Sequence, residues 1–189
     1  MACDVSRFSL ETTEDGNIPP EALLFRTLVK IVNFNSEEKT KIESAAELVK
    51  KVIMGQEFKD AVVGHIFNGE KTFVDNSGLT NLQIYDRIII AAERLTPEQN
   101  YRLDVELELY YEDSPTIGYT YPTSRRIWMN RKFFSRYSPY QVAGNLTHEW
   151  LHKLGFIHEV EDSDSRPFSV PYAIGYIVRR LASEMYPGL

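Results

Sequence analysis

Two histidines, His148 and His152, lie four residues apart in a segment whose flanking residues predict a helix. Side chains at this spacing project from one face of a helix, so both imidazoles can reach the same metal ion. Gly155 follows the expected end of this helix, and glycine tolerates the left-handed backbone that reverses a chain. The reversal brings His158 back toward the other two, whereas a continuing helix would carry it about 9 Å further along the axis. The spacing therefore predicts a helix, a glycine turn and a three-histidine metal site.

Glu149 follows the first histidine and lies about 100° further around the helix. Three imidazoles suit one zinc ion and leave its fourth position open for water. A carboxylate in this place misses the metal but lies beside that water, so Glu149 is the expected general base and His148, His152 and His158 are the expected ligands. The alternative is that these histidines are structural. His65, the fourth histidine, has no partner pattern and is expected to be structural.

The segment from His148 to His158 is similar to the signature HExxHxxGxxH of the metzincin clan of zinc metallopeptidases. Glu159, directly after the third histidine, resembles the astacin version of that signature. The disulfides of astacins are excluded, because Cys3 is the single cysteine. The chain thus most resembles a small bacterial metzincin. This resemblance implies a zinc endopeptidase that acts on a peptide or protein substrate.

The resemblance also implies a methionine in a tight turn beneath the metal, after the third histidine. The one later methionine, Met185, falls at the end of the expected last helix. Residues 169–172 (Ser-Val-Pro-Tyr) lie just before that helix and carry no methionine, and we expect them to replace the turn. The resemblance further implies that Tyr172 or Tyr176 donates to the oxyanion, with plain packing as the alternative for each.

Hydrophobic periodicity predicts an α+β fold, and the resemblance implies that this fold is of the metzincin type. We expect a twisted mixed sheet of four to five strands, a backing helix, an active-site helix and a small C-terminal subdomain that ends in a helix. The expected strands are 28–34, 103–111 and 127–133, and the expected helices are 36–54, 80–94, about 139–154 and one that starts near 171, with a helical turn at 57–65. Ser36 is the expected N-cap of the first helix, and Gly55 is expected to end it.

Two further segments have an expected role. The resemblance places 127–133 where metzincins keep the edge strand that pairs with substrate. The acidic run 159–164 is expected to be a solvated loop, with a calcium site as the alternative. Residues 1–20 are polar and are expected to form a flexible arm, followed by a single catalytic domain over 21–189.

The formal net charge of −6 argues against a nucleic-acid partner, since phosphate binding needs a basic face. No apolar run is long enough to cross a bilayer, and no secretory signal is visible. The cellular compartment is therefore not predicted. We expect the protein to be a monomer. Cys3 has two minor interpretations: the remnant of a bacterial lipoprotein start, or, with Asp4, a latency switch at the metal. Two functional alternatives also stay open, namely a latent or non-proteolytic zinc-stabilised binding module, and hydrolysis of a non-peptide amide.

Overall fold

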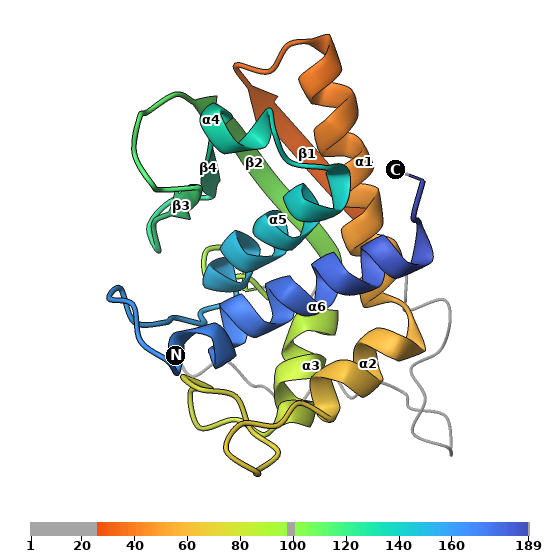
Figure 1. The fold of residues 1–189 in the computed structure, drawn as a ribbon, viewed down its shortest axis with the longest axis vertical. Coiled ribbons are helices and arrows are strands. Elements are labelled where there is room, and N and C mark those ends of the chain that lie inside the picture. Colours follow the sequence, from red (N-terminus) through yellow and green to blue (C-terminus); the bar gives the residue numbers. More distant parts are fainter. Residues whose placement is uncertain (1–25, 98–100, 189) are drawn as a thin grey trace, which may run out of the picture.

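The computed structural model describes residues 26–97 and 101–188, and within them the chain forms an α+β fold (Figure 1). The sheet is mixed and has four strands, within the predicted four to five, and its strand order is β1-β2-β4-β3. Its three longer strands are parallel, and the short β3 is antiparallel to β4. The strands are β1 (Arg26–Val32), β2 (Arg102–Tyr110), β3 (Gly118–Thr120) and β4 (Arg126–Asn130).

The central strand β2 shows why one face of the sheet is covered by helices. Its apolar side chains alternate with charged ones, and because successive side chains point to opposite faces, all apolar ones share one face. Leu103, Val105, Leu107 and Leu109 are 0–2% exposed, so this face forms the core. The other face carries ion pairs, such as Arg126 Nη1 with Glu108 Oε2 at 2.7 Å.

Helix α1 (Ser36–Ile53) packs against this sheet as the predicted backing helix. The six apolar residues expected on its inner face, namely Ile42, Ala45, Ala46, Val49, Val52 and Ile53, are all buried. The predicted N-cap was wrong by one residue, whereas the helix stops before Gly55 as predicted. The N-cap is Asn35, which forms a capping box with Glu38, and Ser36 is the first helical residue. The helix ends at Ile53 before Gly55, which has φ −80° and caps the next helix, α2 (Gln56–Val63).

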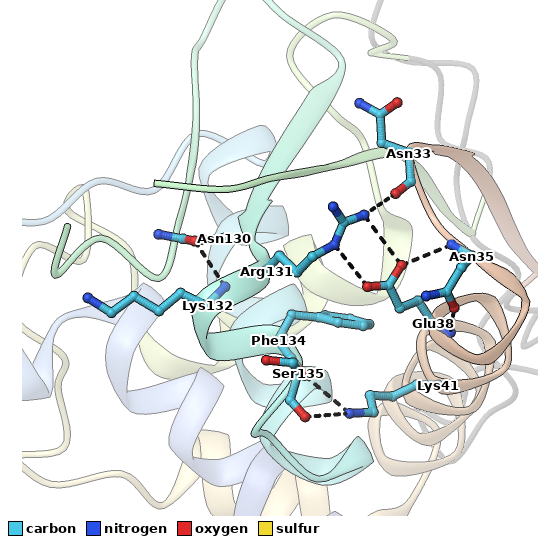
Figure 2. Close-up of polar contacts among 9 residues, drawn as sticks. All are labelled: Asn33, Asn35, Glu38, Lys41, Asn130, Arg131, Lys132, Phe134 and Ser135. Carbon is cyan, nitrogen blue, oxygen red and sulfur yellow. Dashed lines mark hydrogen bonds and ion pairs between the residues drawn. The ribbon is translucent and has the colours of Figure 1, made fainter. Parts of the chain in front are cut away.

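The chain leaves the sheet through a short helix, α4 (Arg131–Phe134), which is tied to α1 by charged groups (Figure 2). Arg131 Nε donates to Glu38 Oε1 at 2.9 Å, and its guanidinium also donates to the carbonyl of Asn33. Lys41 Nζ donates to the carbonyls of Phe134 and Ser135 at 3.2 and 3.3 Å. These contacts fix the point from which the next helix starts.

Two boundaries on either side of the sheet differ from the sequence prediction. The expected strand 127–133 ends at Asn130, because the Asn130 side chain accepts from Lys132 N and so starts α4. Helix α3 (Asn81–Ile90) begins with the predicted capping box of Thr80 and Gln83, but it ends four residues before Arg94. Ala91 takes the left-handed conformation (φ 51°), which stops the helix there.

Helices α5 (Pro139–Lys153) and α6 (Val170–Met185) lie side by side beneath the sheet (Figure 1). They cross at Gly144 and Gly175. A methyl group on Gly144 would lie 2.8 Å from the Gly175 carbonyl oxygen, and one on Gly175 would lie 3.4 Å from His148 Cβ. The two glycines therefore let α6 approach the face of α5 that carries the histidines.

Among the described residues, no helix is both long and apolar enough to span a membrane. The expected flexible arm over residues 1–20, with Cys3 and Asp4 and their proposed role in latency, lies outside the residues that the structure describes.

Candidate metal centre

Helix α5 is defined at both ends by features that the sequence predicted. Ser138 and Gln141 form a capping box, and Pro139 occupies the first turn. The helix ends at Lys153, and Gly155 has φ +98°, the left-handed conformation that a side chain would strain. The chain therefore turns at Gly155, as expected from the spacing of the histidines.

This turn brings His148, His152 and His158 together. One ring nitrogen from each lies within 4.8 Å of the others, and the three ring centroids are 5.0–5.1 Å apart. His148 Nε2 and His158 Nε2 are separated by 3.2 Å. Ligands about 2.1 Å from a tetrahedral zinc ion are about 3.4 Å apart, so this spacing suits two nitrogens on one ion. The three histidines could hold a metal ion.

The outer ring nitrogens determine how the inner ones point. His152 Nδ1 lies 2.8 Å from the carbonyl of Phe156, and His158 Nδ1 lies 2.7 Å from the carbonyl of Glu159. The His148 ring hydrogen-bonds to the backbone of Pro171. When each carbonyl accepts a hydrogen bond from the outer ring N–H, the lone pair of the inner nitrogen is directed at the centre of the group. Such an arrangement of facing lone pairs is repulsive without a cation and favourable with one.

The protonation states of the ligands also suit a metal. Burial lowers the pKa of His152 to about 4 and that of His148 well below its usual 6.5. Both rings are therefore neutral at pH 7, and a neutral imidazole is the form that binds a metal.

Glu149 is buried on α5, and its carboxyl group lies close to strand β3. It is 4% exposed, and burial raises the pKa of its carboxyl to about 8, against the opposing effect of Lys153. A methyl group on Gly118 of β3 would lie 3.3 Å from Glu149 Oε1 and 3.3 Å from Asn145 Oδ1. The carboxyl group thus lies directly under the outermost strand. A cation nearby would favour its charged form.

Strand β3 is the outer strand of the sheet in the described part of the chain, and β4 pairs on both sides. The expectation that 127–133 forms the edge strand was therefore wrong. The reason is the β3–β4 hairpin, which adds one antiparallel strand outside β4. Strand β3 has only three residues, too few to show a strand pattern in the sequence. Lys153 fixes this hairpin to α5, because its Nζ donates to the carbonyls of Ser124 and Arg126 (3.0 Å for the latter).

Tyr172 lies against the histidines from the side of α6. Its ring centroid is 4.4 Å from that of His148 and 4.7 Å from that of His158. The Tyr172 hydroxyl accepts a hydrogen bond from Arg166 Nη2. Burial raises the pKa of Tyr172, an effect that Arg166 opposes. Tyr176, one turn further along α6, is 51% exposed, with its ring 6.1 Å from that of Tyr172.

Residues 169–172 were expected just before the last helix, but Val170, Pro171 and Tyr172 form the first turn of α6 and Ser169 is its N-cap. Val74 N donates to the carbonyl of Phe168 and Val170 N donates to the carbonyl of Val74, which fixes this segment to the loop before α3. Met185 lies at the last position of α6 and is 41% exposed, about 20 Å along the helix from Tyr172. Within the acidic run 159–164, Glu159, Glu161, Asp162 and Asp164 are half-exposed or exposed.

His65 is part of an aromatic cluster. Its ring stacks on Phe73 at 4.0 Å and lies 6.3 Å from Phe168, and His65 Nε2 is buried without a hydrogen-bond partner among the described residues. Burial lowers the pKa of His65. This placement agrees with a structural histidine, packed behind the segment that carries Tyr172.

Sequence reasoning missed two groups of residues that support the site. Arg166 carries no recognisable motif, and only its spacing of six residues from Tyr172 connects them. Arg94 N donates to the carbonyl of Lys153 at 2.9 Å and its Nη2 to the carbonyl of Gly155 at 3.3 Å, while Trp150 Nε1 donates to the buried Glu93 Oε1 at 2.9 Å. These contacts join α5 to a segment almost sixty residues earlier, which spacing within one helix does not reveal.

No protein-family model matches this chain, and no curated protein matches it either. What the site does must therefore be argued from its own residues.

Proposed function

We propose that the chain is a zinc endopeptidase of the metzincin type, with one zinc ion held by His148, His152 and His158. The observation that carries this proposal is the convergence of three imidazoles, each hydrogen-bonded to the backbone, on one point of the helix that also carries the buried Glu149. The resemblance of the segment 148–158 to the metzincin signature supports the same conclusion.

The proposed mechanism assigns roles to three groups of this chain and to the zinc ion that its histidines would hold. Zinc, when bound, lowers the pKa of its water to about 7 and polarises the scissile carbonyl. Glu149 accepts a proton from the attacking water on its carboxylate and delivers it to the leaving amine. The Tyr172 hydroxyl donates to the oxygen on which negative charge develops. The exposed backbone of β3 holds the substrate chain in an extended conformation beside Glu149.

The finer features of the fold are part of this proposal. Residues 21–189 form one catalytic domain, α5 is its active-site helix, and the part that follows Gly155 is a small subdomain. Residues 169–172 take the place of the methionine turn. This is supported by the hydrogen bond from His148 to Pro171 and the contact of the Tyr172 ring with His148. The turn then supports the ligands and supplies none, so the missing methionine leaves metal binding intact.

The proposal is tested by Glu149→Ala in the full chain, with casein as an unfolded substrate. We expect the wild type to cleave casein, a chelator to abolish cleavage and added zinc to restore it. Glu149→Ala should bind one zinc per chain and leave casein intact, because it lacks the group that moves the proton. Glu47→Ala, on the exposed side of α1, is the control and should retain full activity.

Three outcomes contradict the proposal. Undiminished cleavage by Glu149→Ala rejects the mechanism. Zinc binding that raises the melting temperature, without cleavage of casein or peptides by the wild type, indicates the non-proteolytic or latent alternative. Cleavage of small amides but not of peptides would indicate the third alternative.

A further inference from the structure

A basic hollow lies at one end of α5, next to the proposed zinc site. Its lining residues are Glu93, Arg94, Leu95, Pro122, Arg125, His152 and Lys153. Three of the lining side chains are basic and one is acidic, in a chain whose formal net charge is −6, although burial lowers the pKa of Lys153 to about 8. Because His152 is both a proposed ligand and part of the wall, whatever occupies this hollow lies beside the reacting bond.

The three basic side chains of this hollow differ in how many of their hydrogen-bond donors are already used within the protein. Lys153 Nζ donates to two carbonyls of the β3–β4 hairpin, and Arg94 Nη2 donates to the carbonyl of Gly155. Arg125 is exposed at the tip of the hairpin, and among residues 26–97 and 101–188 nothing forms a hydrogen bond or ion pair with its guanidinium. It acts on the Glu93 carboxyl only through space. Arg125 is therefore the cation with free donors at the mouth of the hollow.

The carboxylate inside the hollow does not neutralise Arg125. Glu93 is 5% exposed, and its carboxyl already accepts from Trp150 Nε1 at 2.9 Å. Burial raises the pKa of the Glu93 carboxyl, and the hydrogen bond from Trp150 and the charges of Lys153 and Arg125 oppose this effect. A carboxylate that arrives from solvent meets Arg125 and the outer side of Arg94 first.

The position of the hollow relative to the substrate follows from the packing of β3 on α5. Gly118 lies over Asn145 and Glu149, whereas the carbonyls of Ser124 and Arg126 lie over Lys153. A chain bound along β3 therefore runs from Glu149 toward the hollow. One helical turn is about 5.4 Å, and extended residues are about 3.3 Å apart. A substrate residue one or two positions from the cleaved bond is thus placed over the hollow.

We propose that Arg125, exposed at the rim of this small hollow, forms a subsite for an acidic side chain one or two residues from the scissile bond and determines specificity there. The substrate class is then peptides with glutamate or aspartate at that position. That the ligand is a peptide substrate rests on the proposed endopeptidase function. The preference for an acidic side chain rests on Arg125. The Arg125 guanidinium can donate two parallel hydrogen bonds to a carboxylate. A glutamine side chain, which is uncharged and of similar shape, accepts them more weakly.

The test uses the zinc-loaded full chain and quenched fluorescent peptides that differ only by Glu or Gln at one of three positions on either side of the central bond. We expect one position at which the Glu peptide has a kcat/KM about 5-fold higher than the Gln peptide at low salt. The ratio should fall toward 1 at about 0.5 M salt, because the pair is exposed to solvent. Arg125→Gln should abolish the ratio, and Arg125→Glu should make a Lys peptide better than the Gln peptide. Arg180→Gln, on the exposed side of α6, is the matched loss of one positive charge and should leave the ratio unchanged.

A second measurement separates this inference from the proposed function. The same peptides are titrated into the metal-free protein and binding is followed by fluorescence anisotropy, with the same Glu preference expected and the same loss in Arg125→Gln. An equal ratio in the wild type and in Arg125→Glu, at every position and in both assays, overturns the subsite and leaves the peptidase proposal standing. Glu-selective binding that depends on Arg125, without hydrolysis of any peptide, supports the subsite and overturns the peptidase proposal.

Discussion

The guanidinium of Arg166 donates a hydrogen bond to the hydroxyl of Tyr172, whose ring lies 4.4 Å from the ring of His148. Since this hydroxyl accepts from a cation, its own proton is free to be donated elsewhere. The positive charge of Arg166 also makes the phenol a better donor. The pair therefore presents a hydrogen-bond donor beside the three histidines.

Tyr172→Phe tests whether this donor acts on the reaction. If the hydroxyl stabilises the oxyanion only in the transition state, the substitution lowers kcat by about 100-fold and leaves KM nearly unchanged. Steady-state kinetics with one peptide substrate measures both constants. Tyr176→Phe, which removes the hydroxyl one turn away, is expected to retain the wild-type kcat. A large loss of kcat in Tyr176→Phe with none in Tyr172→Phe would move the role to the second tyrosine.

Arg166 is expected to act through Tyr172 and not directly on the substrate. Arg166→Gln should lower kcat by about 10-fold, because a neutral amide holds the hydroxyl less firmly. The same substitution made in Tyr172→Phe should have almost no further effect, since the group it positions is gone. Kinetics of the two single variants and the double variant give this comparison. Additive losses would show that Arg166 contributes separately from Tyr172.

Gly155 is expected to be intolerant of any side chain for two separable reasons. Its φ of +98° strains an L-residue, and a methyl group would lie 2.6 Å from Arg94 Nε. Gly69 has φ +82° and nothing within 4 Å of an added methyl group, so Gly69→Ala carries the backbone strain alone.

Gly69→Ala should therefore lower the free energy of unfolding by about 1 kcal/mol, and Gly155→Ala by about 1–3 kcal/mol more. Urea unfolding of both variants gives the two values. Gly155→Ala should also bind zinc more weakly, because the turn that returns His158 is displaced. Equal stability of the two variants, with unchanged zinc affinity, would show that the turn adapts freely.

The histidine spacing predicted the site because local rules govern it. An i, i+4 pair on a helix, a glycine with positive φ and a third histidine three residues later are all set within eleven residues. The position of the edge strand was not predictable in this way. Strand β3 has only three residues, too few for an alternating pattern, and its place depends on contacts of Lys153 with a distant hairpin. The link between Arg166 and Tyr172 likewise depends on how the loop folds over α6.

His65 should make the protein less stable in acid. Burial lowers its pKa in the folded state, so the unfolded chain takes up a proton at a higher pH than the folded protein does. The free energy of unfolding therefore decreases as the pH falls below about 6.5. His65→Phe removes this contribution. The stability of the variant relative to the wild type should therefore be greater at pH 5 than at pH 8.

Urea unfolding at both pH values, at one zinc concentration, measures this difference. The three ligand histidines are the same in both proteins, so their titration cancels. A constant difference between wild type and variant at the two pH values would show that His65 titrates alike in the folded and unfolded states.

The central claim is an open three-histidine zinc site, and X-ray absorption at the zinc edge of the full chain tests it most directly. We expect three imidazole nitrogens and one oxygen at about 2.0–2.1 Å, with three nitrogens reduced to two in His158→Ala. A sulfur neighbour at about 2.3 Å would contradict the claim, because it would place a thiolate, and so Cys3, in the position that the mechanism reserves for water.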